Sequence, residues 1–125
     1  MLKNVFVSLR RQLRLYEERL EILKNWKEYV KRIAGVSEKL LEGCEVYVFG
    51  SAIKGMLTAA SDIDVLIVTE NLPKKILERA RVKDEIERLA CLPPYHPIQI
   101  HLLTKEEAKH SSIYYKIIKE SIRIA

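Results

Sequence analysis

The sequence has little of what disulfide-stabilised, membrane-spanning or secreted proteins need. Its two cysteines, Cys44 and Cys91, form neither a metal-ligand spacing nor a disulfide framework. The run closest to membrane character, Val65 to Val68, is far too short to span a bilayer. Three arginines between positions 10 and 14 interrupt the apolar stretch that a signal peptide would need. We therefore expect a cytoplasmic protein that makes no contact with a membrane.

The chain has enough apolar residues to form a core, and its net charge is positive. Hydrophobic residues make up 48% of the 125 residues, which excludes a disordered chain and suits one domain. The formal net charge of +5 suits an anionic ligand such as a nucleotide, and it leaves binding to nucleic acid open. Arginines and lysines of the first third are mixed with glutamates, a pattern typical of a solvated helix face.

The N-terminal third predicts one long amphipathic helix. From Leu2 to about Ile33 there is no proline or glycine, and apolar residues recur in steps of three and four. Gly35 is expected to end this helix. Ser37 is expected to cap a short second segment, which Gly43 stops.

This helical extension, residues 1–43, is too long for the domain predicted at residues 44–125. A helix from Leu2 to Ile33 would measure roughly 50 Å, more than the width of so small a domain. Part of its apolar stripe is therefore expected to pair with a second copy of the chain, or else with a different protein. The alternative is that the helix bends or breaks near Asn25 and packs entirely against its own domain.

The remaining sequence predicts an α+β fold, in which a mixed β-sheet is flanked by helices. The run from Ile63 to Thr69 is apolar beyond Asp64, which predicts a central strand buried on both faces. Thr104 and Glu107 have the spacing of a capping box at the start of a helix. The expected elements are strands at 45–49, 63–69, 98–103 and 121–124, and helices at about 71–90, after Thr104 and at about 112–119.

The stretch from Gly50 to Asp64 carries the candidate chemistry. A strand that ends in Gly50 and Ser51 and opens into a helix presents backbone N–H groups at a positive helix end, where a phosphate binds. Glycine at position 50 allows close approach, Gly55 keeps the next turn clear, and Lys54 adds a charge that suits a triphosphate. We therefore predict a nucleotide-binding turn at these four residues.

Asp62 and Asp64 start the second strand and are separated by one residue. Side chains at positions i and i+2 of a strand lie on the same face, about 7 Å apart along the backbone. Two carboxylates so placed can hold hard divalent cations such as magnesium or manganese, with substrate phosphates completing the ligand shell. Each motif is common alone, but Gly-Ser, a glycine four residues later and Asp-x-Asp before a buried strand form a rare combination.

The run FGSAIKGMLTAASDIDVLIV resembles the core motif of the minimal nucleotidyltransferases, members of the DNA polymerase beta superfamily. The resemblance covers about residues 45–103. It implies that Gly50 and Ser51 contact nucleotide phosphates and that Asp62 and Asp64 bind metal. It also implies a mixed sheet flanked by helices, and transfer of a nucleoside monophosphate from a triphosphate, expected to be ATP, to an acceptor hydroxyl.

Active members of this superfamily usually supply a third carboxylate from the next core strand, and here the sequence departs from that pattern. The matching position is Gln99, whose neutral amide binds magnesium more weakly than a carboxylate and cannot act as a base. His101 lies on the same strand face by period two. It is either a ligand or a base, or else a partly buried histidine held by hydrogen bonds.

Four further residues near strand ends have suitable chemistry. Glu45 and Glu70 are carboxylates, and geometry decides whether either reaches the site. The aromatic pair Tyr95 and His96 has the chemistry to stack on a base. Aromatic residues near strand ends are more often part of the core, and we do not assign base stacking to this pair.

Three functions are compatible with these residues. The first is an enzyme that transfers a nucleotidyl group with divalent metal, slowly or only with a partner because of Gln99. The second, implied by the resemblance, is the antitoxin half of a pair with a HEPN-type ribonuclease, which it masks or to which it attaches AMP. The third is a catalytically impaired protein that binds a nucleoside triphosphate without transfer. We expect the first, with the second as its alternative.

Overall fold

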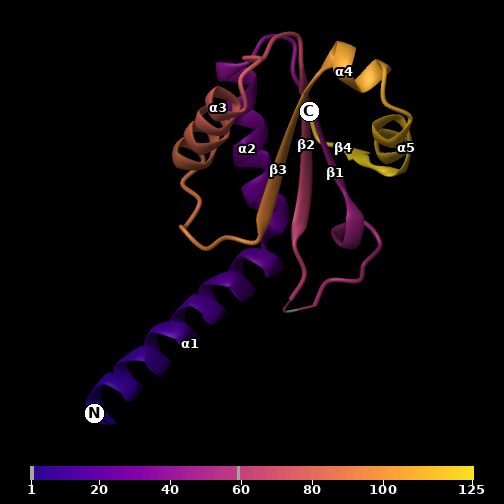
Figure 1. Ribbon diagram of the computed structural model, residues 1–125. Coiled ribbons are helices and arrows are strands. Elements are labelled where there is room, and N and C mark those ends of the chain that lie inside the picture. The colour runs from indigo at the N-terminus through magenta and orange to yellow at the C-terminus, as the bar shows by residue number, and fades with distance from the viewer. Residues whose placement is uncertain (1, 59) are drawn as a thin grey trace.

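The computed structural model describes residues 2–58 and 60–125 and has a four-stranded sheet with helices on both faces (Figure 1). The strand order is β3-β2-β1-β4, in which β1 is antiparallel to β2 and β4, and β2 is parallel to β3. The predicted α+β fold with a mixed sheet is therefore confirmed. The elements are α1 (Leu2–Lys24), α2 (Trp26–Leu40), β1 (Glu45–Phe49), the 3-10 turn η1 (Gly50–Ala52), β2 (Ile63–Thr69), α3 (Ile76–Leu89), β3 (Ile98–Thr104), α4 (Lys105–Lys109), α5 (Ser112–Glu120) and β4 (Ile122–Arg123).

The alternation of side chains along the strands divides the apolar residues between two cores. In β2, Val65 and Ile67 join the core that α2 and α3 cover, whereas Leu66 and Val68 join the core under α4 and α5. Figure 1 shows these two helix pairs on opposite faces of the sheet. The helices α4 and α5 are short, and the beginning of their sheet face stays accessible, as the exposed side chain of Gln99 indicates. A functional site therefore has room on this face.

The predicted long N-terminal helix is broken in two. Asn25 has φ −111° and ψ 28°, outside the helical region, and α2 then continues through Gly35 to Leu40. The expectation that Gly35 ends the helix is wrong, because burial of one face of α2 against the sheet holds the helix through its glycine. Ser37 is not a cap either. It is fully buried within α2, and its hydroxyl donates to the Ile33 carbonyl at 2.7 Å.

Helix α1 extends away from the sheet (Figure 1). Near its end, Ile22 and Leu23 are buried in the core that α2 and α3 share with the sheet. The part of α1 before Glu17 is different, because six large apolar side chains there are exposed, namely Val5, Phe6, Val7, Leu9, Leu13 and Tyr16. The predicted break near Asn25 is therefore present, but the apolar stripe does not pack entirely against its own domain. No helix in the described ranges is long and apolar enough to cross a membrane.

Arg79 links the segment before α3 to the start of α4 through hydrogen bonds. Helix α3 begins at Ile76, later than predicted, because residues 71–75 form an irregular segment in which the Pro73 carbonyl accepts from Arg79 Nε at 2.6 Å. The Arg79 guanidinium also donates twice to Glu107, which lowers the pKa of that carboxyl. The predicted capping box between Thr104 and Glu107 is confirmed.

Replacing Gly35 by alanine is expected to stabilise the protein. Position 35 lies inside α2, and a Cβ added there would have no atom within 4 Å. Alanine is favoured over glycine in a helix interior by about 0.5–1 kcal/mol, so the midpoint of thermal unfolding measured by circular dichroism should rise by about 2–4 °C. The matched control is Gly43→Ala, which should lower the midpoint because Gly43 has φ +57° and a Cβ there would lie 2.8 Å from Glu70 Cγ. A lowered midpoint for Gly35→Ala would contradict its place inside an open helix face.

Candidate active site

Four polar side chains meet where the parallel strands β2 and β3 begin. Asp64 lies opposite Gln99 in the register of the two strands. The Gln99 amide nitrogen donates to Asp62 Oδ2 at 3.4 Å, and His101 Nε2 lies 3.3 Å from Asp64 Oδ1. The structure therefore brings the two aspartates together with both residues expected near the third-ligand position. Their roles as ligands or base stay a prediction.

The glycine turn lies directly against one of these aspartates. Gly50 has φ +83°, in the left-handed region that favours glycine, and a Cβ there would lie 2.8 Å from Asp64 Oδ2. Any larger residue would therefore displace either the turn or the carboxylate. Ser51 follows in the same turn, and its carbonyl accepts the Met56 N–H at 3.0 Å. The turn and the carboxylates thus form one site.

The expected helical stretch after Gly50 is shorter in the structure. The segment after Gly50 is a single 3-10 turn of three residues rather than an α-helix, so few peptide dipoles add up there. A phosphate would be bound by individual N–H groups of the turn. Gly55 has φ +67°, and a Cβ at this position would meet no atom within 4 Å. Lys54 lines a small cavity of about 130 Å³ beside Phe49 and Ile53.

A residue from α1 completes the surroundings of Asp62, and sequence reasoning missed it. Arg19 Nη2 donates to the Ser61 carbonyl at 2.6 Å and to Asp62 Oδ1 at 3.1 Å. Asp62 is thus held at one oxygen by Arg19 and at the other by Gln99. Arg19 stands 43 residues before Asp62 in a run of mixed charge, so no local signal distinguishes it from its solvated neighbours.

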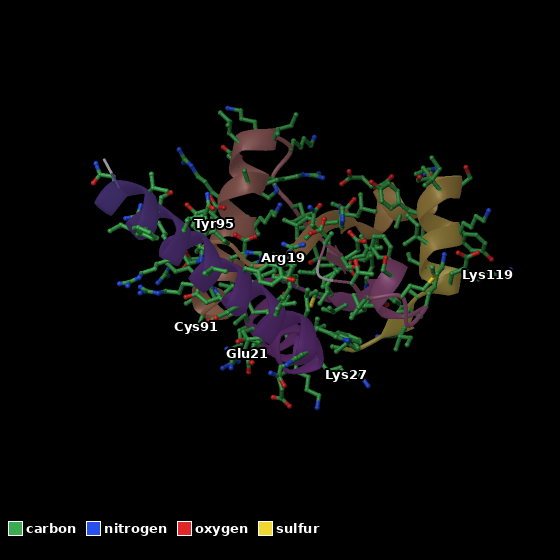
Figure 2. All side chains as sticks on the ribbon, turned by 90° about the horizontal axis from the view of Figure 1, so that it is seen from below. Arg19, Glu21, Lys27, Cys91, Tyr95 and Lys119 are labelled. Atoms are coloured by element: carbon green, nitrogen blue, oxygen red, sulfur yellow. The ribbon has the colours of Figure 1, made fainter. Side chains whose placement is uncertain are left out.

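A groove of about 500 Å³ opens beside Asp62 and Gln99. Its volume is in the range of small-molecule sites. Figure 2 labels Arg19 and Tyr95, which line this groove from α1 and from the loop before β3. The other lining residues are Leu15, Tyr16, Pro94 and His96.

Tyr95 lies outside the core. Its side chain is 67% exposed, because the proline-rich loop before β3 holds it at the surface beside the groove. His96 is largely buried instead, since its Nδ1 accepts the Ile98 N–H at 3.1 Å and its Nε2 lies 3.3 Å from Glu87 Oε1. The groove therefore has a fixed histidine and an exposed tyrosine on one wall.

The two other candidate carboxylates do not reach the aspartates. Glu45 lies opposite Val68, at the far end of β1, and accepts a hydrogen bond from the Tyr47 hydroxyl at 2.7 Å. Glu70 follows the far end of β2 and pairs with Lys105 at 2.8 Å. Among the residues that the structure describes, no group of three or more histidine, cysteine, aspartate or glutamate side chains is placed to hold a metal ion. The acidic part of the site is the aspartate pair.

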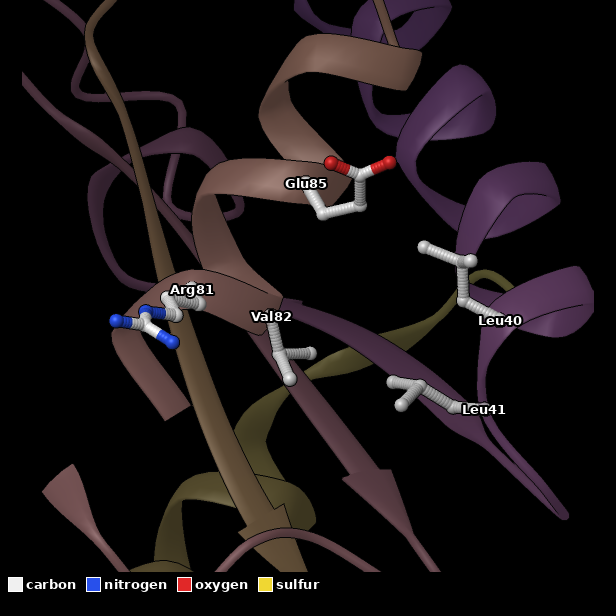
Figure 3. Close-up of a pocket in the computed structure, with 5 residues that line it drawn as sticks. All are labelled: Leu40, Leu41, Arg81, Val82 and Glu85. Carbon is white, nitrogen blue, oxygen red and sulfur yellow. The ribbon is translucent and has the colours of Figure 1, made fainter. Parts of the chain in front are cut away.

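A separate pocket of about 350 Å³ lies between the end of α2 and α3 (Figure 3). It is on the sheet face opposite Asp64, because α2 and α3 cover the core to which Val65 and Ile67 belong. Its one carboxylate, Glu85, is paired with Arg88. This pocket therefore lacks the paired aspartates of the candidate site. It is lined by Leu40, Leu41, Arg81, Val82 and Glu85.

Among the solved structures that resemble this chain are two candidate nucleotidyltransferases. One is a candidate nucleotidyltransferase from Sulfolobus solfataricus, with 25% identity and a TM-score of 0.50, where the match covers 87% of this chain and 84% of that one. The other is also described as a candidate nucleotidyltransferase, with 27% identity and a TM-score of 0.49, covering 76% of this chain and 96% of that one. No curated protein matches the sequence.

The family model described as "Polymerase beta, Nucleotidyltransferase" matches residues 31–125. The matched range begins inside α2 and includes the whole sheet, the glycine turn and both aspartates. It covers well over half of the chain, and the mixed sheet agrees with the similarity to the Sulfolobus solfataricus structure. The chain therefore belongs to the polymerase beta family of nucleotidyltransferases.

Proposed function

We propose that this protein transfers a nucleoside monophosphate from a nucleoside triphosphate, with ATP as the expected donor, to an acceptor hydroxyl. The observation that carries the proposal is the contact between the glycine turn and the aspartate pair. Gly50 leaves space only for a hydrogen atom beside Asp64 Oδ2, so a triphosphate bound by the turn would have its phosphates next to the carboxylates. Nucleotidyl transfer needs this proximity, because positioning and charge stabilisation supply most of the catalysis in phosphoryl transfer.

The aspartate pair fits a divalent cation such as Mg²⁺ or Mn²⁺. Asp62 and Asp64 offer hard oxygen ligands from one strand face, and the missing side chain of Gly50 leaves Asp64 Oδ2 uncovered by a Cβ. These two residues would hold the ion, with phosphate oxygens as its other ligands. When bound, a divalent cation neutralises charge on the phosphates and lowers the pKa of the acceptor hydroxyl.

The other side chains of the site have separate tasks in this proposal. Ser51 and the turn N–H groups bind the phosphates, and Lys54 adds positive charge on the same side. Arg19 and Gln99 hold Asp62 in one orientation through its two oxygens. The groove opens beside Asp62 rather than beside the turn, so it offers the acceptor a path to the aspartates that the triphosphate does not occupy.

Gln99 is the reason to expect a low rate of nucleotidyl transfer. It stands beside Asp64 in the neighbouring strand, where a carboxylate would add a negative ligand, and its amide nitrogen donates to Asp62. An amide in this position weakens cation binding, because affinity follows the charge of the ligand set. We infer slow or partner-dependent transfer.

A second candidate function is binding to a protein partner, of which a HEPN-type ribonuclease is the expected example. The observation that favours it is the exposed apolar side of α1. In that function the chain masks its partner, or modifies it by the transfer proposed above. Copurification of a helical partner from the native source would support this function, and recovery of the chain alone would count against it.

Replacing Asp64 by asparagine is expected to reduce transfer by about 100-fold or more, because a neutral amide removes a charged ligand next to the phosphates without changing the size of the side chain. Transfer is measured with alpha-labelled ATP, and Mn²⁺ binding is measured separately by calorimetry. The control is Asp84→Asn, which removes the same charge from an exposed position of α3. Unchanged labelling in the Asp64 variant would rule out transfer at this site.

Replacing Gln99 by glutamate is expected to tighten Mn²⁺ binding and to increase transfer, each by about tenfold, because it adds a third negative charge beside Asp64. The control Gln12→Glu makes the same change on α1, far along the chain from the site. If wild type is silent and the Gln99 variant is active, the natural protein binds the triphosphate without transfer. No change in either binding or transfer would show that position 99 does not contact the cation.

Gly50→Ala is expected to abolish transfer and to destabilise the fold by about 1–2 kcal/mol, because alanine would have to adopt φ +83° and displace Asp64. Gly43→Ala is the matched control, since it also combines a positive φ with a close contact, but to Glu70 away from the site. Both variants should lose stability in thermal unfolding. Transfer lost equally in both, at temperatures where both are folded, would contradict a specific role of Gly50.

A further inference from the structure

The exposed stripe of α1 has the repeat of a coiled coil. Phe6, Leu9, Leu13 and Tyr16 follow one another in steps of three, four and three residues, and we name these four residues the seam. This spacing gives the seven-residue repeat in which apolar side chains at two positions face another helix. Each seam side chain is between 48% and 61% exposed, so about half of its surface is open to a partner.

The seam is continuous with residues that do have a partner. Leu20 and Leu23 extend the same repeat by another heptad, and there the helix packs on the core formed with α2 and the sheet. The apolar repeat therefore runs outward from the domain along the part of α1 that extends away in Figure 1. Most of the stability of a helix in a protein comes from packing of its apolar face. The outer turns of α1 need a partner surface of the same periodicity, which a second helix provides.

The charges that flank the seam favour a second copy of this chain in antiparallel orientation. Arg10 and Glu17 lie on the same edge of the seam, one heptad apart. In an antiparallel pair centred between Leu13 and Tyr16, Arg10 lies beside Glu17 of the partner subunit. The two-fold axis repeats this contact on the same flank, so that flank carries two pairs of opposite charges. Self-complementarity of this kind is what an interface between identical subunits requires.

A parallel pair with the heptads aligned is less favourable. It sets Arg19 beside Lys24 of the partner subunit on both flanks, because these positions adjoin in a parallel coiled coil. Like charges at such positions destabilise the pair. The charge pattern therefore distinguishes between the two orientations.

We propose that this protein forms a two-fold symmetric dimer in which the α1 helices pack antiparallel along the seam. Leu13 packs against Tyr16 of the partner subunit, and Leu9 lies opposite Leu20 of the partner subunit, which its own core covers only in part. Tyr16 also lines the groove beside Asp62. The dimer thus places a second helix against one wall of that groove. The proposal does not depend on nucleotidyl transfer, because the mass of the particle is measured without nucleotide.

The expected affinity is modest. Only a few apolar side chains from each helix enter the contact, which is less than the roughly 1,600 Å² that a standard stable interface buries. We therefore expect a dissociation constant on the order of micromolar, where a tenfold change corresponds to about 1.4 kcal/mol. Light scattering coupled to size exclusion should give a mass that rises from monomer to dimer as the full-length chain is concentrated from about 1 to 300 μM, a range that spans such constants.

Leu13→Glu is expected to weaken the dimer by at least about 100-fold, because it places a charge in the apolar contact from both subunits. The matched control is Val7→Glu, on the same helix at nearly the same exposure, 58% against 61%, but outside the seam. This control should still dimerise. Circular dichroism and thermal unfolding establish that both variants keep the fold. A wild type that stays monomeric throughout the range, or a dimer that Leu13→Glu leaves intact, would overturn the proposal.

A charge exchange tests the orientation. Arg10→Glu alone should weaken the dimer by about tenfold, because two attractive pairs become repulsive, each worth a fraction of a kcal/mol at the surface. The double variant Arg10→Glu with Glu17→Arg restores opposite charges in the antiparallel pair and should regain the wild-type dissociation constant. Failure of the second change to restore dimerisation would overturn the antiparallel arrangement.

Discussion

The parallel pairing of β2 with β3 is the constraint on which the candidate site depends. This pairing sets Asp64 opposite Gln99 and brings His101 to the same face. The other residues of the site are arranged around the start of these two strands. The glycine turn reaches it from β1, which lies on the other side of β2, and Arg19 reaches it from α1. Three segments that are distant in the chain thus meet at the first residues of one central strand.

Features with a local cause could be predicted from the sequence. The span of β2 follows from its apolar run, and the Thr104 capping box follows from two residues three positions apart, so neither depends on the rest of the fold. The placement of Asp62 and Asp64 on one face needs only the period of a strand. The family resemblance likewise rests on a short continuous run of residues.

Features with a non-local cause were not predictable. Gly35 has the local signature of a helix end, but packing of α2 on the sheet overrides it. The late start of α3 depends on Arg79, whose guanidinium is shared between Pro73 and Glu107. Arg19 is the clearest case, because its contact with Asp62 exists only once the fold brings α1 next to the residues that precede β2. Charge composition cannot separate such a residue from the solvated arginines around it.

The alternation of β2 between two cores has a consequence for how the chain folds. A shift of β2 by one residue would leave its backbone pairing intact but exchange the two faces, since side chains alternate with period two. Asp64 would then point into the apolar layer under α2 and α3, where an unpaired carboxylate costs several kcal/mol. An apolar residue at that position would carry no such penalty in either alignment. Asp64 therefore also disfavours the shifted register of β2. The same carboxylate thus serves the candidate site and helps to select one native strand pairing.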